Sequence, residues 1–238
     1  MTVSLPPAPP VTTVEAAVSQ MQAIAAALPV ADGVACFNRM YLEVTQQVES
    51  ELSLGSFGDP GWMSALDVTF ANLYFAAVEA GSESVTGGAS VPAAWGPLFA
   101  QRDNPEITSL QFALAGMNAH INHDLPIALV QTCQQRGSSP EAGTHHADYQ
   151  KVDALLDAAE QSTRQSFESG AELGADKDVQ PVLDLVANWS INSARDVAWD
   201  TGLALWLSRD IALVEDMLMN SLARTVAMAS SLLLVAVS

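Results

Sequence analysis

The 238-residue sequence contains few basic residues. Nine Lys and Arg stand against 27 Asp and Glu, which gives a formal net charge of −18 at pH 7. Such a surface repels the phosphate backbone of nucleic acids, and it also repels the anionic headgroups of a membrane. We therefore expect neither nucleic acid nor an anionic membrane surface as a partner.

Cysteine is scarce as well, and the N-terminus lacks the features of a signal peptide. Cys36 and Cys133 lie far apart, so they form neither a disulfide framework nor a CxxC metal site. The first residues, MTVSLPPAPPVTT, have no basic region and no continuous apolar region. We therefore expect a cytoplasmic protein in which residues 1–12 form a flexible, proline-rich tail.

Long hydrophobic runs are missing too. The longest uncharged apolar run, TVAMASSLLLVAVS, follows Arg224, and its 14 residues fall short of the roughly 20 that span a bilayer. The sequence predicts no stable membrane insertion. The run is instead expected to be a buried helix or a contact between subunits of a homo-oligomer.

What the sequence does contain is typical of a helical protein. Apolar residues make up 49% and charged residues only 15%, and the apolar residues recur at three- and four-residue spacing rather than in alternation. These features predict an all-α, single-domain bundle of about seven or eight helices over residues 13–238. The helices are expected at 13–28, 32–54, 60–80, 104–136, 145–169 and 179–209, and from residue 211.

The four histidines fall within 27 residues of one another. On a helix, His120, His123 and Asp124 share an arc of about 100°, which directs three ligand-type side chains toward one point. Ala113 and Gly116 precede them on the same arc, so we expect free space in front of the imidazoles.

A proline follows this arc directly. Pro126 cannot donate to the carbonyl of Asn122, so the backbone beside the arc should be kinked or split.

His145 and His146 open the next predicted helix. The positive end of the helix dipole favours neutral imidazole there, which is the form that binds metals. With His120, His123 and Asp124 they make a predicted set of ligands for a divalent metal such as Zn²⁺, Fe²⁺ or Mn²⁺. The alternative interpretation is that these side chains only satisfy buried polar groups or cap a helix.

The absence of two motifs excludes two common types of metal site. No Glu-x-x-His is present, which removes the carboxylate-bridged di-iron signature. No HExxH is present either, which removes the common zinc-protease motif.

Three further polar residues are candidates for catalysis. Asp67 lies on an apolar helix face, where it pairs with a Tyr or Arg, serves as a fourth metal ligand, or acts as a base with raised pKa. Arg195 shares a face with two tryptophans, so it either lines an aromatic-walled pocket or pairs with Asp67 or Asp196. Asp148 lies close to the histidine pair and is a candidate proton acceptor.

Several sequence blocks resemble a known family. The block AGMNAHINHDLP (115–126), together with FNRMYLEVT, AAWGPLF, HHADYQKVDALL and ARDVAWDTGLALW, resembles a bacterial family of uncharacterised domains over about residues 31–210. This resemblance implies a single domain, and it carries no reaction and no residue roles.

The leading functional hypothesis is a helical enzyme that acts on a small, largely apolar molecule by metal-assisted hydrolysis. Two alternatives remain open at this point. One is a metal-independent isomerase, cyclase or lyase that uses histidine as acid and base in an apolar pocket. The other is a helical protein that binds a ligand without transforming it.

Overall fold

Helices joined by turns and loops make up the described part of the chain, residues 9–83, 90–156 and 190–236 of a computed structural model. This confirms the all-α prediction. In chain order the elements are α1 (Val14–Ala27), α2 (Gly33–Ser53), α3 (Pro60–Glu83), α4 (Gly96–Gln101), α5 (Ser109–Ala119), the π-helix η1 (His120–Asp124), α6 (Leu125–Arg136), a helical segment at 145–156, α9 (Ile191–Ser208) and α10 (Ala212–Leu233).

Side chains that accept backbone N–H groups set the helix starts. Thr13 and Asp32 cap α1 and α2, because an oxygen in each accepts an N–H of the first turn. The helix expected from residue 104 begins only at α5, because Thr108 and Gln111 form a capping box at that point. Likewise α9 begins at residue 191, where Ser190 accepts from Ser193, and the rest of the predicted helices at 157–189 lies outside the described residues.

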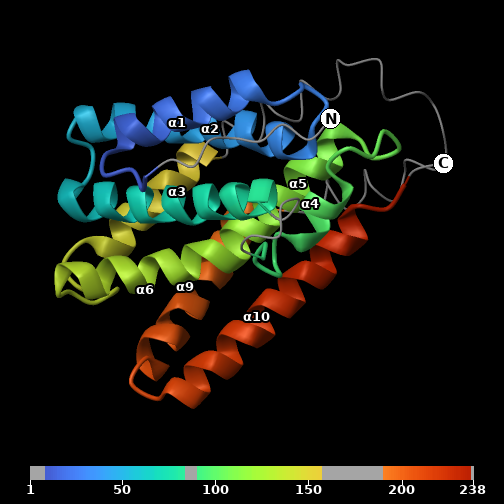
Figure 1. Ribbon diagram of the computed structural model, residues 1–238. Helices are drawn as coiled ribbons and strands as arrows, with labels where there is room; N and C mark the ends of the chain where they lie inside the picture. Colours follow the sequence, from blue (N-terminus) through green and yellow to red (C-terminus); the bar gives the residue numbers. More distant parts are fainter. Residues whose placement is uncertain (1–8, 84–89, 157–189, 237–238) are drawn as a thin grey trace.

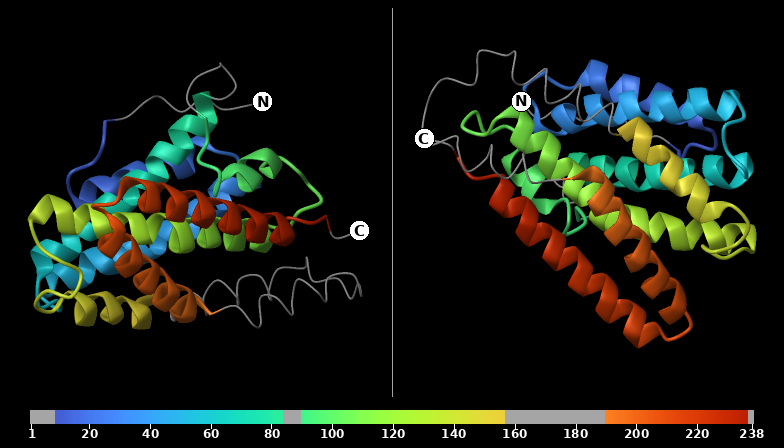
Figure 2. Two further views of the ribbon diagram at one scale, coloured as in Figure 1. Left: turned by 90° about the horizontal axis from the view of Figure 1, so that it is seen from below. Right: turned by 180° about the vertical axis from the view of Figure 1, so that it is seen from behind.

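A central rod made of α5, η1 and α6 organises the bundle. Figure 1 shows α1 and α2 side by side, with α5 and α6 running end to end from the right of the view to its lower left. The α5 half packs against α2 and α10, and the α6 half packs against α3 and α9. Figure 2 shows the same rod from two other sides, with α9 and α10 projecting from the body as a helical arm.

The inner side of α10 is fixed to the rod by amide side chains. Gln111 Nε2 donates to the carbonyls of Leu233 and Val235 at 2.9 and 2.8 Å. Asn118 Nδ2 donates to the Val226 carbonyl at 3.0 Å and to Ser230 Oγ at 2.9 Å. The C-terminal run is therefore a helix that is buried along one side. None of the helices in the described ranges has the length and apolar character needed to cross a bilayer.

Candidate active site

His120, His123 and Asp124 lie on the π-helix η1, in the middle of the central rod. The N–H of Leu125 donates to the carbonyl of His120, five residues back, where an α-helix would use four. The backbone is thus distorted next to Pro126, as the sequence predicts, and the distortion takes the form of a π-helical turn.

The carboxylate of Asp124 forms hydrogen bonds with three surrounding side chains. Its Oδ2 accepts from Trp95 Nε1 at 2.9 Å and faces His120 Nδ1 at 3.0 Å, while its Oδ1 faces His123 Nδ1 at 2.7 Å. Burial alone would raise the pKa of Asp124, but the hydrogen bonds from the two imidazoles lower it below its usual value. An ionised carboxylate can only accept hydrogen bonds, so both Nδ1 atoms carry the proton.

His120 is the more deeply buried of the two imidazoles, with 2% of its surface exposed. Its ring stacks on Phe70 with 3.5 Å between ring centroids and lies 4.4 Å from the ring of Tyr41. Burial lowers the pKa of His120, and the Asp124 carboxylate opposes that shift only in part. The ring is therefore neutral near pH 7, with its proton on Nδ1 and a lone pair on Nε2.

The space expected in front of the imidazoles is filled at Gly116. A Cβ placed on this glycine would come within 2.4 Å of Phe37 Cγ and 2.6 Å of Phe37 Cβ. At Gly116 itself no space is free, because a ring from α2 packs directly against the backbone of α5. Glycine is required at this position for close helix packing.

We expect Gly116→Ala to reduce the free energy of unfolding by about 1–3 kcal/mol, because the new methyl group overlaps Phe37 near its backbone. Urea denaturation measures this loss. Gly96→Ala is the control, since a Cβ there meets no atom within 4 Å. Equal stability of the two variants would contradict the close packing at Gly116.

His145 and His146 have other partners. His145 Nδ1 lies 2.9 Å from the carbonyl of Ser139, and its ring stacks on Trp62 with 4.2 Å between centroids. His146 is exposed and stacks against Trp199 at 4.4 Å. Both imidazoles pack on tryptophans rather than at η1.

The predicted metal ligands, His120, His123, Asp124, His145 and His146, therefore do not make one site. Over residues 9–83, 90–156 and 190–236, no three or more His, Cys, Asp or Glu side chains are arranged to hold a metal ion. The metal prediction stays a prediction, and this geometry does not favour it.

Asp148 holds a loop in place. It accepts the backbone N–H groups of Gly58 and Asp59 at 2.8 and 2.7 Å, and it also accepts from Thr144 and Lys151. Burial alone would raise the pKa of Asp148, but these four donors lower it to about 2. A carboxylate with this pKa is a weak base, so the geometry supports a structural role at the start of α3 rather than proton transfer.

Arg195 also has different partners from those that the sequence suggests. Its Nε donates to Asp153 Oδ1 at 2.6 Å, and its Nη2 donates to the carbonyl of Tyr149 at 2.5 Å. The guanidinium lies 4.0 Å from the centroid of the Tyr149 ring. The predicted pairing with Asp67 or Asp196 is thus wrong, because Asp153 in the 145–156 segment takes that place.

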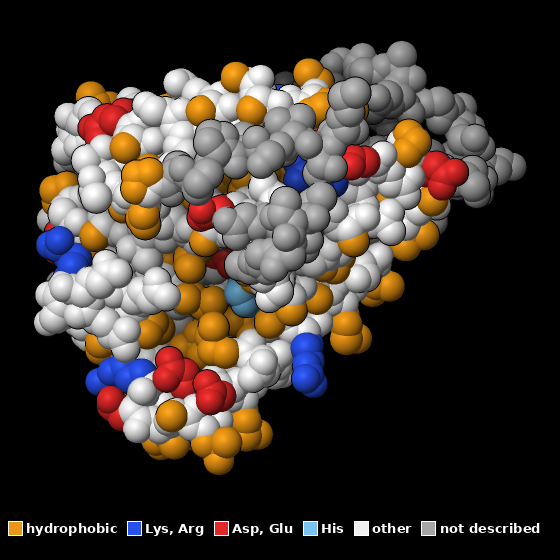
Figure 3. All heavy atoms as spheres, viewed as in Figure 1, with side chains coloured by type: hydrophobic (Ala, Val, Ile, Leu, Met, Phe, Trp, Pro, Cys, Tyr) orange, Lys and Arg blue, Asp and Glu red, His pale blue; other side chains and the backbone are white. Residues whose placement is uncertain are grey.

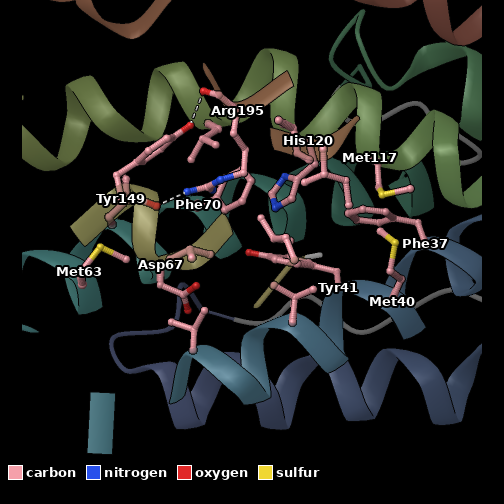
Figure 4. A pocket seen from close by; sticks show the side chains of 18 residues that line it. Phe37, Met40, Tyr41, Met63, Asp67, Phe70, Met117, His120, Tyr149 and Arg195 are labelled. Atoms are coloured by element: carbon pink, nitrogen blue, oxygen red, sulfur yellow. Dashed lines mark hydrogen bonds between the residues drawn. The ribbon is translucent and has the colours of Figure 1, made fainter. Parts of the chain in front are cut away.

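An apolar cavity lies beside His120 (Figure 4). Its free volume is about 70 Å³, roughly half of the ~150 Å³ of a cavity that accepts benzene. Most of its wall is aliphatic or aromatic, and Arg195 borders one end. Met40, Met63 and Met117 also line it, and their flexible side chains allow the cavity to adapt its shape.

Three polar atoms on this apolar wall have no hydrogen-bond partner among the described residues. They are Tyr41 Oη, Asp67 Oδ2 and His120 Nε2. Figure 4 shows the three side chains around the cavity, coming from α2, α3 and η1. Each buried polar group without a partner costs about 1–3 kcal/mol. Their gathering at one cavity is therefore typical of a site that binds a ligand.

The protonation states of these groups differ. Burial, and to a smaller extent Glu49, raises the pKa of Asp67 to about 7, which agrees with the interpretation of this residue as a base with raised pKa. Burial and the negative charge of Asp67 raise the pKa of Tyr41 well above its ordinary value. The cavity thus offers a basic nitrogen, a hydroxyl donor and a carboxyl group that is half protonated near neutral pH.

Tyr41 and Trp95 are site residues that the sequence argument missed. The only local signal for Tyr41 is a hydroxyl on the apolar stripe of α2. Trp95 gives no local signal, because it lies 29 residues before Asp124 and just ahead of the short helix α4.

Comparison with known proteins places the chain in a family. No curated protein and no solved structure matches it. The model of a family described as a family of unknown function (DUF5995) matches residues 14–236, which confirms the resemblance to an uncharacterised family. Since the match spans nearly the whole sequence, the chain belongs to this family of unknown function.

Proposed function

We propose that the protein is a metal-independent enzyme that binds a small, largely apolar molecule with one carbonyl or hydroxyl group and moves a proton on it. The observation that carries this proposal is the gathering of three unpaired polar atoms on an otherwise apolar cavity wall. A ligand hydroxyl would pair with all three atoms, because it both donates and accepts. A carbonyl oxygen would accept from Tyr41 and protonated Asp67, and it would leave the lone pair of His120 Nε2 free to take a proton from carbon.

In the proposed reaction, His120 Nε2 is the general base. Its lone pair faces the cavity, and Asp124 is a positioning residue because it holds the Nδ1 proton and thereby fixes the tautomer. Asp67, protonated, or Tyr41 donates a proton to the substrate oxygen. The pKa of Asp67 is raised and that of His120 is lowered, so near neutral pH the first can donate a proton while the second accepts one. Such an acid and base pair suits isomerisation, cyclisation or elimination.

Metal-assisted hydrolysis, the leading hypothesis from the sequence, receives less support. Both carboxylate oxygens of Asp124 already form hydrogen bonds with His120, His123 and Trp95. The other two histidines pack on tryptophans.

We also propose that the protein is cytoplasmic. Its two cysteines are free and buried, which agrees with a reducing compartment.

A small unsaturated ketone tests the proposal without knowledge of the natural substrate. It is about as large as benzene, so its binding requires Met40, Met63 and Met117 to move and enlarge the cavity. Conversion of 3-cyclopentenone to 2-cyclopentenone removes a proton next to the carbonyl and returns one at the far carbon, so it needs a base and an acid. Ultraviolet absorbance of the conjugated product follows the reaction. We expect a rate above that of buffer, unchanged by EDTA, and lowered roughly 100-fold or more in His120→Phe.

The controls separate the alternatives. His145→Phe should retain the rate, because His145 packs on Trp62 outside the cavity. Circular dichroism verifies that both variants are folded. A rate that EDTA abolishes and Zn²⁺, Fe²⁺ or Mn²⁺ restores would favour the metal hypothesis. Binding of cyclopentanone seen by saturation-transfer NMR, without isomerisation, would indicate a ligand-binding protein instead of an enzyme.

A further inference from the structure

The outer side of α10 is apolar and exposed. Of the twelve large apolar side chains that are exposed in the described part of the chain, ten lie on α9, on α10 or directly beside them. Six of these ten are on α10, and we call them the outer stripe: Leu213, Val214, Met217, Leu218, Met228 and Leu232. Figure 3 shows apolar atoms along the outer edge of this arm and at its tip.

The members of the outer stripe lie on one side of α10, four in its first two turns and two in its last two turns. At about 100° per residue, its six members fall within an arc of about 140°. Val226, Ser230 and Leu233, which face the body of the protein, lie on the opposite side of the helix. A helix that is apolar on both sides is expected to be covered on both sides.

The amount of exposed apolar surface matches a protein interface. The six side chains of the outer stripe present on the order of 700 Å² of accessible surface, slightly more than the patches of about 300–600 Å² that a typical monomer exposes. A stable interface buries about 800 Å² on each partner. The outer stripe therefore supplies most of the surface that such a contact needs.

The spacing of the outer stripe favours a second copy of this chain as the partner. An antiparallel pairing of two α10 helices centred between Leu222 and Ala223 places Leu213 opposite Leu232 and Met217 opposite Met228 of the other copy. Arg224 is the only charged residue within the arc of the outer stripe. In this register it lies opposite Ser221 of the other copy, so the two Arg224 side chains do not meet directly.

A groove beside the outer stripe gives room for such an approach. It lies between α9 and α10 and is lined by Ala204, Leu218, Ser221 and Thr225, among others. Small side chains allow two helices to come close together. The groove adjoins the centre of the pairing, since Ser221 and Leu222 both line it.

We propose that the protein forms a two-fold symmetric homodimer in which the outer stripes of two α10 helices pack antiparallel to each other. The body of each subunit, with its cavity, lies on the opposite side of α10, so the dimer leaves the proposed active site intact.

Sedimentation velocity on the full chain tests this proposal. We expect a species of twice the 25.1 kDa chain mass at micromolar concentration. The double variant Met217→Glu/Met228→Glu should weaken dimerisation roughly 100-fold or more, because it buries four carboxylates in an apolar interface. Leu54→Glu is the matched control, since Leu54 is 73% exposed but lies between α2 and α3. That variant should remain a dimer.

Crosslinking supplies a readout that does not depend on stability. Ser221→Cys should form disulfide-linked dimers under mild oxidation with copper phenanthroline, whereas Leu54→Cys should not. The native Cys36 and Cys133 are buried and do not interfere.

Three results would overturn the proposal. The first is a wild-type chain that stays monomeric, and the second is a dimer that survives Met217→Glu/Met228→Glu. The third is a monomer that sediments with phosphatidylcholine vesicles, which would make the outer stripe a lipid-binding face.

Discussion

Replacement of Asp67 by Asn should raise the free energy of unfolding at pH 8 by up to about 4 kcal/mol and leave it almost unchanged at pH 4. The reason is the shift of the Asp67 pKa from an ordinary 3.8 to about 7 in the folded protein. Between these values the unfolded chain releases a proton that the folded chain retains. The native protein therefore loses stability as the pH rises through this window, and the Asp67→Asn substitution removes that loss.

Urea denaturation of both proteins at several pH values measures the effect. The difference between the two curves isolates Asp67, because His120, whose pKa is lowered by burial, changes stability in the opposite direction and is present in both. Asp200→Asn removes an exposed carboxylate and serves as the charge control. Parallel curves for wild type and Asp67→Asn would show that the carboxyl group is solvated or paired in the folded protein.

Loss of the Asp124 carboxylate should be the most damaging single change at the candidate site. We expect Asp124→Ala to lower the free energy of unfolding by about 3–5 kcal/mol. The carboxylate binds Trp95 Nε1 and the Nδ1 atoms of His120 and His123, and all of these residues are buried. The variant leaves three buried donors without an acceptor.

A double-mutant cycle shows whether the network is the cause. Trp95→Phe removes one of the three donors, so Asp124→Ala should cost about 1 kcal/mol less in that background. Asp103→Ala, at an exposed aspartate, controls for the loss of charge. Strictly additive effects would indicate that Trp95 and Asp124 are not coupled.

Local signals were sufficient to predict most of the fold. Thr13 and Asp32 have the side chains that cap helices, and each precedes a run with helical spacing, so the starts of α1 and α2 were predicted to within one residue. The start of α5 was missed by several residues, because Asn104-Pro105 resembles a cap while the true cap is the reciprocal pair of Thr108 and Gln111. The sequence contains two possible helix caps within five residues, and only the packing around them decides which one begins the helix.

The candidate site was predictable only where its residues are neighbours in sequence. His120, His123 and Asp124 were grouped correctly, since three- and four-residue spacing is a local property. The contact of Asp124 with Trp95 and that of Arg195 with Asp153 depend on how distant segments pack. The same holds for Phe37, which fills the space that Gly116 was expected to leave open.

The π-helix η1 has a consequence for the whole bundle. One α-helical residue turns the chain by about 100°, so one extra residue in a helical turn rotates everything after it by a similar angle. The π-turn therefore determines which side chains of α6 point toward α3 and α9. The direction of α5 matters less, because residues 111–119 are buried on every side between α2, α10 and their neighbours. One extra residue in η1 thus sets the orientation of the second half of the rod alone.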